Sequence, residues 1–156
     1  TVPNRIAYDR LFLSTKRLAN VLQSFSFSYT LYLSFMVEGV PVQVKGSKDR
    51  FRDFVYIDDL VDAWMAAYEN PISYGKVYNL ASQEKVTVEA LLELLKQCIG
   101  DEHYPIEYYE GTPGDQFGVI GNNQKIKTEL GWAPKVELPV GLNKMLESLK
   151  KGVNIG

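Results

Sequence analysis

Two arginines, Arg50 and Arg52, are the residues of this chain best suited by type and spacing to bind an anion. Alternate residues of an extended strand share one face, so both guanidinium groups can point to the same side of a sheet. A guanidinium group donates two parallel hydrogen bonds to a phosphate, so such a pair suits a diphosphate. The alternative is that the arginines pair with Asp49, Asp53 or Asp58 and do no chemistry.

The sequence after these arginines predicts a strand, a tight turn and a capped helix. Residues 54–57, Phe-Val-Tyr-Ile, form an apolar β-prone run that is too short for a helix. Asp58 or Asp59 is the predicted N-cap, because a carboxylate accepts the free amide hydrogens at a helix start. Apolar residues then recur at helical spacing until Pro71 ends the helix.

The rest of the chain alternates predicted helices with short predicted strands. The expected helices cover residues 18–39, 87–100, 124–130 and about 142–149, with N-caps at Thr87 and Asn122 and ends at Gly39, Gly100 and Gly131. The expected strands cover residues 40–45, at a sheet edge, 76–81 and 106–109, with 10–13 as a weaker candidate. The aromatic residues between 25 and 32 are assigned to a core or dimer surface, although a strand at 24–28 is an alternative.

This order predicts an α/β (mixed α+β) protein whose short strands are covered by helices. A length of 156 residues suits a single domain, with a poorly determined segment at 1–17 and a polar tail at 150–156. A hydrophobic fraction of 46% and a charged fraction of 23% are typical of a folded globular chain. The net charge of −2 argues against general binding to nucleic acid or to an anionic membrane.

The single cysteine, the single histidine and the distribution of apolar residues bear on disulfides, metal sites and cellular location. Cys98 is the single cysteine, so an intrachain disulfide and a cysteine-based metal site are both excluded. His103, the single histidine, lies in a polar loop and is expected to be solvated rather than a base or metal ligand. The chain shows neither a signal peptide nor a run of apolar residues long enough to span a membrane, so we expect a cytoplasmic location.

The central run Arg-Asp-Phe-Val-Tyr-Ile-Asp-Asp, residues 52–59, resembles the carboxyl-terminal part of the NAD-dependent epimerase/dehydratase family. These proteins are extended short-chain dehydrogenase/reductases that act on nucleotide sugars. The resemblance covers about residues 18–149 and includes Val-Tyr-Asn-Leu-Ala at 77–81, Gly-Thr-Pro-Gly-Asp at 111–115 and Gly-Trp-Ala-Pro at 131–134. In that family these parts build the smaller substrate domain and the last pieces of the Rossmann sheet, so the amino-terminal Rossmann half is not expected here.

The resemblance implies a nucleotide-sugar site. Arg52 matches the arginine that grips the diphosphate, a bidentate task for which lysine is a poor substitute. Asn20 and Val21 resemble an asparagine-containing turn whose side chain and backbone also meet the diphosphate.

Three further residues complete the implied site. Gln43 and Lys45 fall where the family holds the nucleobase against its edge strand, although Gln43 can equally be an outward-facing polar residue. Asp115 resembles a loop aspartate near the nucleotide, although Gly-Asp is also an ordinary turn sequence. Related enzymes carry an arginine shortly before this loop, and residues 109–112 offer none.

The sequence departs from the family where the family does its chemistry. It contains no Gly-x-x-Gly-x-x-Gly turn, which lets a dinucleotide pyrophosphate approach a helix N-terminus. None of its ten tyrosines has lysine four residues later, so the catalytic Tyr-x-x-x-Lys pair is absent, and Ser-Thr-Lys at 14–16 replaces the Tyr-Gly-Pro turn. We therefore expect no catalytic residue, no metal site and no bound cofactor in this chain alone, NAD being the cofactor of the family.

Three functional hypotheses follow. The first is a truncated or stand-alone nucleotide-sugar-binding domain without redox activity by itself. The second, from another class, is a non-enzymatic assembly module that forms a homo-oligomer or binds a partner through surfaces that a Rossmann half would cover. The third is one half of a split epimerase whose Rossmann-bearing half is another chain.

Overall fold

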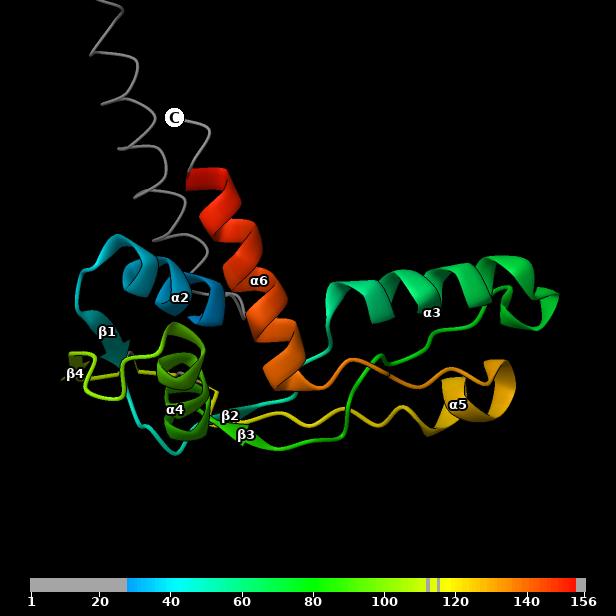
Figure 1. The fold of residues 1–156 in the computed structure, drawn as a ribbon. Coiled ribbons are helices and arrows are strands. Elements are labelled where there is room, and N and C mark those ends of the chain that lie inside the picture. Colours follow the sequence, from blue (N-terminus) through cyan, green and yellow to red (C-terminus); the bar gives the residue numbers. More distant parts are fainter. Residues whose placement is uncertain (1–27, 112, 115, 154–156) are drawn as a thin grey trace, which may run out of the picture.

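The computed structural model describes residues 28–111, 113–114 and 116–153, which form helices packed around short strands. The elements are α2 (Ser28–Glu38), β1 (Val42–Lys45), β2 (Phe51–Arg52), α3 (Ile57–Glu69), the 3₁₀ turn η1 (Pro71–Ser73), β3 (Val86–Thr87), α4 (Val88–Ile99), β4 (Ile106–Tyr109), α5 (Gln124–Leu130) and α6 (Leu138–Val153). Figure 1 shows α2, α4 and α6 gathered around β1 and β4, with α3 and α5 extending away to the other end. The predicted mixed α/β class is confirmed.

The four strands in the described residues form two small sheets. β1 and β4 are parallel, with Val42 opposite Ile106 at one end and Lys45 opposite Tyr109 at the other. Along β1, burial alternates with a period of two, which is the pattern of a strand with one face in the core. β2 and β3 are antiparallel and short. The predicted strands at 40–45 and 106–109 are confirmed.

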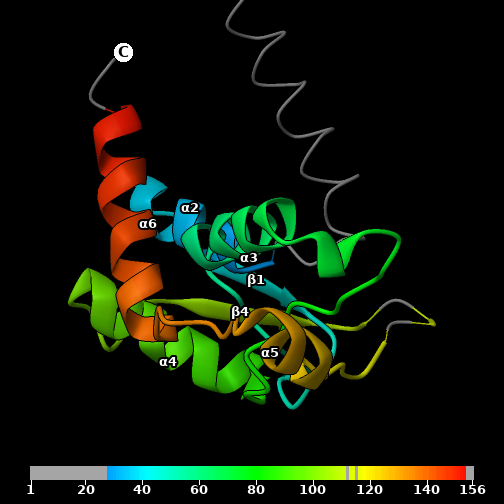
Figure 2. The same cartoon turned by 90° about the vertical axis from the view of Figure 1, so that its right-hand side faces the viewer.

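The main core lies between β1 and the three helices α2, α4 and α6. α6 packs against both α2 and α4 (Figure 2). The buried members of this core are Tyr32, Leu33, Met36, Val42, Val44, Leu91, Leu92, Leu95, Leu142 and Leu146. Tyr32 therefore belongs to the core, as expected for the aromatic stripe; the other members of that stripe lie outside the residues whose side chains the structure describes.

A second apolar cluster holds the far end of the molecule together. Ala63 of α3, Ile126 of α5 and Trp132 are buried in it. The indole Nε1 of Trp132 donates to the backbone oxygen of Asp59 at 2.9 Å. The Asp59 carboxylate, 2% exposed, accepts the backbone N–H groups of Lys135 and Val136, each at 3.0 Å. Asp59 thus ties the start of α3 to the segment that leads into α6.

Several predicted helix ends are confirmed. The hydroxyl of Thr87 accepts the N–H of Ala90 at 3.1 Å and caps α4, and Gly100 ends that helix in the left-handed conformation. Gly131 ends α5 in the same way. The predicted N-cap of α5 is displaced by one residue: Asn123 occupies the N-cap position, while the Asn122 side chain accepts the N–H of Gln124 at 2.9 Å. α6 begins before its predicted start and includes residues 150–153 of the predicted tail.

The predicted strand at 54–57 is wrong. The paired residues are Phe51 and Arg52, and α3 already begins at Ile57. The apolar run links the two clusters instead, because Phe54 packs on the main core and Val55 on the second cluster. The predicted caps are also wrong: Tyr56 occupies the N-cap position without a side-chain bond, and Asp58 pairs with Lys144.

The predicted strand at 76–81 is extended but joins no sheet in the described part of the chain. A strand is defined by its hydrogen-bonded neighbour, and here the neighbouring contacts are side-chain ones: Tyr78 and Leu80 pack on the second cluster. The predictions for residues 1–27, including the strand at 10–13 and most of the helix at 18–39, lie outside the described residues. Among the helices that are described, none has the length and apolar composition needed to cross a membrane.

Candidate functional site

The parallel strands β1 and β4 end side by side, and a turn after β1 leads to Arg52 in β2. The chain leaves β1 through Gly46, whose N–H donates to the oxygen of Tyr109 at 2.9 Å. It then returns as β2, where the Phe51 N–H donates to the oxygen of Phe117 at 3.1 Å. Arg52 therefore lies beside the segment 116–118, which follows the loop after β4.

Neutral oxygens surround the Arg52 guanidinium group. Its Nη1 donates to the oxygen of Phe51 at 2.7 Å and, at 3.5 Å, to that of Phe117. Its Nη2 donates to the oxygen of Gln116 at 3.1 Å. Within the described part of the chain all its acceptors are backbone carbonyls, so no carboxylate offsets its charge. Phosphate oxygens are stronger acceptors than carbonyls, which makes this half-buried cation suited to bind a phosphate.

Phe51 fixes the segment that Arg52 contacts. Its ring meets the Phe117 ring edge to face, with centroids 6.0 Å apart, and the Lys85 Nζ lies 4.6 Å from the Phe51 centroid. A Cβ atom added to Gly118 would lie closer than 3.0 Å to three ring atoms of Phe51. Only glycine at 118 therefore allows this close approach.

Arg50 has a different task from Arg52. Its Nη2 donates to the Lys45 oxygen and its Nε to the Ser47 oxygen, so its side chain fastens the turn between β1 and β2. Gly46 adopts a φ of 85° there, and a Cβ at this position would lie 2.9 Å from the Arg50 Cζ. Arg50 precedes β2 and belongs to the turn, so the strand alternation does not apply to it. These contacts give Arg50 a structural role in the turn, and they do not support the alternative in which both arginines hold one diphosphate.

The carboxylates proposed as arginine partners have other contacts. Asp53 accepts the N–H and hydroxyl of Ser82 at 2.7 and 2.6 Å, and the N–H groups of Gln83 and Gly121 at 3.1 Å each. It ties three segments together directly behind Arg52. The sequence analysis did not predict this role. The feature that could have indicated it is that Asp53 is the single carboxylate in residues 50–57, which are otherwise apolar or basic.

Gln43 and Lys45 lie on the exposed face of β1, and Lys45 is the last residue before the turn that leads to Arg52. Glu107 and Tyr109 stand opposite them on β4. The Tyr109 hydroxyl donates to Glu107 at 2.6 Å, and this bond raises the pKa of Tyr109 above its usual value. Within the described part of the chain no hydrogen bond or ion pair joins Arg52 to Lys45 or Gln43, and Gln43 lies one side-chain repeat before Lys45 on the same face of β1.

The remaining predicted site residues, Asn20, Val21 and Asp115, lie outside the described residues. His103 is exposed, and its backbone N–H donates to the Asp101 carboxylate at 3.0 Å. Among residues 28–111, 113–114 and 116–153, no three histidine, cysteine, aspartate or glutamate side chains gather as metal ligands.

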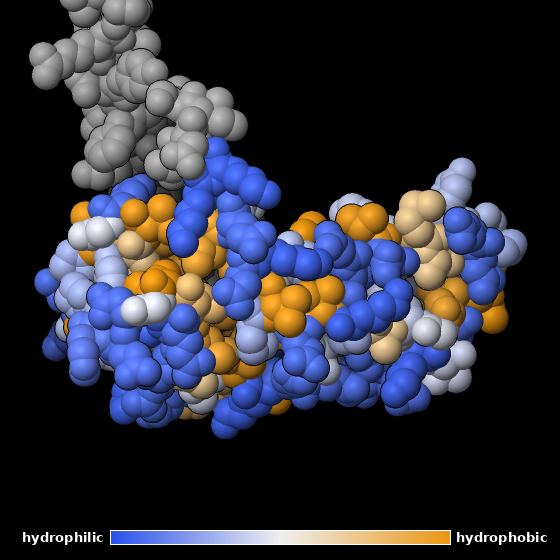
Figure 3. Space-filling view, viewed as in Figure 1, coloured by the Kyte–Doolittle hydropathy of each residue, from blue (hydrophilic) through white to orange (hydrophobic). Residues whose placement is uncertain are grey.

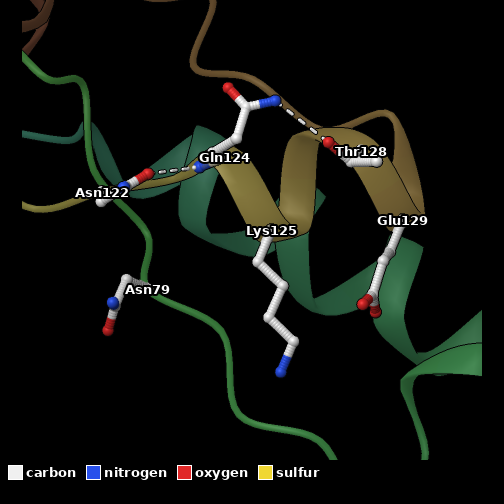
Figure 4. Close-up of a pocket in the computed structure, with 6 residues that line it drawn as sticks. All are labelled: Asn79, Asn122, Gln124, Lys125, Thr128 and Glu129. Carbon is white, nitrogen blue, oxygen red and sulfur yellow. Dashed lines mark hydrogen bonds between the residues drawn. The ribbon is translucent and has the colours of Figure 1, made fainter.

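An open, polar pocket of about 540 Å³ lies away from these residues, between the segment 76–81 and α5 (Figure 4). It is lined by Asn79, Asn122, Gln124, Lys125, Thr128 and Glu129. Several of these groups are bonded within the protein: Lys125 Nζ donates to the Val77 oxygen at 2.9 Å, and Gln124 Nε2 donates to Thr128 at 3.0 Å. It shares no lining residue with the surroundings of Arg52.

The starts of α3 and α4 do not fit the pyrophosphate of a dinucleotide cofactor. A pyrophosphate is normally held where a strand passes through a glycine-rich turn into a helix. α3 is preceded by Phe54, Val55 and Tyr56, and α4 by Thr87, whose hydroxyl already bonds a first-turn amide. Neither helix start lets a pyrophosphate reach the backbone as that turn does.

The chain is similar to known enzymes over most of its described length. The profile of the GDP-mannose 4,6 dehydratase family matches residues 33–145. dTDP-4-dehydro-6-deoxyglucose reductase of Escherichia coli is 28% identical over 120 residues, which are 77% of this chain and 37% of the reductase. UDP-glucose 4-epimerase of Rhizobium leguminosarum bv. trifolii is 32% identical over 89 residues, 56% of this chain and 27% of that enzyme.

Solved structures show the same fold. UDP-glucose 4-epimerase of Thermotoga maritima, solved with UDP-glucose, aligns with a TM-score of 0.74 and 33% identity, over 80% of this chain and 40% of the epimerase. UDP-glucuronic acid 4-epimerase of Bacillus cereus, solved with UDP-glucuronic acid and NAD, shares the fold at a TM-score of 0.74 and 24% identity, over 81% of this chain and 40% of that enzyme.

The extent of these matches defines what the chain is part of. It spans about two-fifths of the length of the reductase and of the solved epimerases. The profile match over residues 33–145 covers more than half of the chain. The chain therefore belongs to the GDP-mannose 4,6 dehydratase family, among the NAD-dependent epimerases and dehydratases of nucleotide sugars that its sequence resembles.

Proposed function

We propose that this chain supplies the nucleotide-sugar-binding part of an NAD-dependent sugar epimerase or dehydratase and has no redox activity by itself. The observation that carries the proposal is the Arg52 guanidinium group, held in β2 by the neutral backbone carbonyls of Phe51, Gln116 and Phe117. The solved relative from Thermotoga maritima contains UDP-glucose, which supports this class of ligand.

In the proposed site each residue has a binding task. Arg52 binds the diphosphate, because its charge is not offset by a carboxylate among the described residues. Lys45 and Gln43 present their side chains along the outer face of β1, where the nucleoside end would lie. Asn20, Val21 and Asp115 remain predicted ligand contacts. No proton or hydride transfer is assigned to this chain, because it contains no Tyr-x-x-x-Lys pair.

Thermal unfolding with UDP-glucose, a dTDP-sugar or NAD tests the proposal. A ligand at ten times its Kd stabilises the folded state by about 1.4 kcal/mol, which raises the Tm of a chain of this size by about 4 °C. We expect this shift with a nucleotide sugar and its loss in Arg52→Ala. Lys48→Ala is the matched control, because Lys48 is an exposed cation of the same turn that pairs with Glu89.

Two results would count against the proposal. If a nucleotide sugar raises the Tm of Arg52→Ala as much as that of the wild type, Arg52 does not contact the ligand. Epimerised sugar or reduced NAD formed by the purified chain would contradict the absence of redox activity.

An assembly module is the second candidate, and the large exposed apolar residues of α3 favour it. It predicts self-association or partner binding without any nucleotide-sugar shift. Sedimentation at increasing protein concentration tests self-association, and a monomer at every concentration would contradict it.

A further inference from the structure

Extended segments join the two ends of the molecule, and Asp53 lies on one of them, directly after Arg52 (Figure 1). Its Oδ1 accepts the N–H and the hydroxyl of Ser82, and its Oδ2 accepts the N–H groups of Gln83 and Gly121. Ser82 and Gln83 belong to the segment between η1 and β3, and Gly121 to the segment between β4 and α5. Hydrophilic side chains lie among apolar ones over the junction between the two ends (Figure 3).

Gln83 is held in a strained backbone conformation. Its φ of 66° is the single positive value among the non-glycine residues that the structure describes. Side chains other than glycine rarely adopt this region, and such a conformation persists where the surrounding structure imposes it. The bonds that Asp53 accepts from Gln83 and from the preceding Ser82 stabilise it here. Strained residues of this kind are concentrated at functional sites, and this one is bonded to the residue next to Arg52.

The same carboxylate acts on the carbonyls around Arg52. The guanidinium group donates to the oxygens of Gln116 and Phe117, and Gly121 follows them in the same segment. Because Asp53 binds the N–H of Gly121, it fixes this segment relative to β2. Its oxygens accept four hydrogen bonds, and within the described residues it forms no ion pair with Arg52. Asp53 therefore holds the surroundings of the arginine without offsetting its charge.

We propose that Asp53 is a positioning residue of the anion site: it fixes the segment whose carbonyls orient the Arg52 guanidinium group toward a diphosphate. Ser82 and Gln83 hold the Asp53 carboxylate in place. This inference rests on the proposed function and adds a residue that does not touch the ligand. A residue that only stabilises the fold would affect ligand binding equally with or without the arginine, whereas a positioning residue acts through Arg52.

Isothermal titration with UDP-glucose tests the proposal on Asp53→Asn. Asp59→Asn is the matched control, because Asp59 is also a carboxylate that accepts two backbone N–H groups, and it lies in the first turn of α3. Urea unfolding should show a loss of stability in both variants. UDP-glucose binding should weaken by about tenfold in Asp53→Asn, within the range of couplings inside one hydrogen-bond network, and should be unchanged in Asp59→Asn. An unchanged Kd in Asp53→Asn, or equal losses in both variants, would overturn the proposal.

Ser82→Ala is the milder variant of the same contact. It removes one of the four donors from the Asp53 carboxylate and leaves the backbone donors in place. It should weaken UDP-glucose binding by about threefold, so the proposal stays testable if Asp53→Asn does not fold. Wild-type affinity in Ser82→Ala would count against the proposal.

The Arg52→Lys background tests whether Asp53 acts through the arginine. Lysine keeps the positive charge but lacks the planar fork that the carbonyls orient. The loss of affinity caused by Asp53→Asn should therefore fall from about tenfold to less than about threefold in this background. A loss of the same size in both backgrounds would assign Asp53 to the fold alone and overturn the proposal.

Nuclear magnetic resonance of the Arg52 side chain without ligand separates this inference from the proposed function. The Nη protons donate to backbone carbonyls, so their exchange with water should be slow in the wild type. Asp53→Asn should accelerate this exchange, and Asp59→Asn should not. Equal exchange in both variants contradicts the positioning role. Faster exchange in Asp53→Asn, in a chain that binds no nucleotide sugar, supports the positioning of Arg52 and contradicts the proposed function.

Discussion

Asp58 and Asp59 are adjacent carboxylates in the first turn of α3, one exposed and one buried. Comparing the variants Asp58→Asn and Asp59→Asn therefore separates the contribution of the buried carboxylate from that of the exposed one. Asp59 is 2% exposed, and its two oxygens accept the N–H groups of Lys135 and Val136. In the Asp59→Asn variant the side chain keeps one acceptor oxygen but turns an NH₂ group toward the other amide. One buried backbone N–H is then left without an acceptor, and the remaining bond loses its charge.

The expected cost follows from these contacts. An unsatisfied buried amide costs about 1–3 kcal/mol, so Asp59→Asn should destabilise the fold by about 2 kcal/mol and Asp59→Ala by about 4 kcal/mol. At roughly 3 °C per kcal/mol, the Tm falls by about 6 and 12 °C. Asp58 pairs with Lys144 at 3.2 Å with both side chains exposed, so Asp58→Asn should cost less than about 1 kcal/mol.

Urea unfolding followed by circular dichroism measures the difference between the two asparagine variants. Both remove one negative charge from the first turn of the same helix, so their loss of helix-dipole stabilisation is the same. The difference therefore reports the bonds to residues 135 and 136. Equal free energies of unfolding for the two variants would refute the argument, because the buried carboxylate would then add nothing beyond its charge.

Three further changes test local features of the structure. Thr87→Ala should lower the free energy of unfolding by about 1 kcal/mol, because the α4 cap is lost. Thr128→Ala, an exposed control in α5, should lower it by less than about 0.5 kcal/mol. Urea unfolding measures both values. Gly118→Ala should destabilise the fold by about 1–3 kcal/mol, because the added Cβ would meet the Phe51 ring. It should also reduce the rise in Tm that UDP-glucose causes. A rise equal to that of the wild type would contradict the role of this contact. Burial and the bond to Glu129 raise the pKa of Tyr78 to about 12. The folded-state pKa exceeds the unfolded-state pKa of about 10. The contribution of Tyr78 to the free energy of unfolding is therefore fully present below about pH 10 and is lost as the pH rises through the folded-state pKa. Tyr78→Phe should remove that slope from the pH dependence of unfolding, and an unchanged slope would contradict the assignment.

Helix ends were predictable from the sequence because their determinants are local. A threonine hydroxyl reaches an amide three residues away, and a glycine takes up the left-handed conformation without a partner elsewhere. Thr87, Gly100 and Gly131 were therefore assigned correctly. The β1 strand was equally local, since its period-two pattern marks the buried face.

The two failed strands show where local reasoning stops. Residues 54–57 and 76–81 are both apolar and β-prone, yet neither finds a hydrogen-bonded neighbour in the described structure. Their side chains instead bridge or cover apolar clusters formed by distant elements. The task of Asp53 was beyond prediction for the same reason, because its donors lie 29, 30 and 68 residues away.

The position of Arg52 is specified by its two neighbours more than by its own contacts. Phe51 packs against Gly118, and Asp53 accepts the N–H of Gly121, so β2 is held against the segment 116–121 on both sides of the arginine. Both glycines are required sterically, since a Cβ at 118 would meet the Phe51 ring and one at 121 would lie 2.5 Å from the Ala81 Cβ. A slip of β2 by one residue would break both contacts and turn the guanidinium away from its carbonyls. The pattern that positions Arg52 in the proposed anion site is therefore Phe-Arg-Asp together with two glycines three residues apart, and the arginine alone is not sufficient.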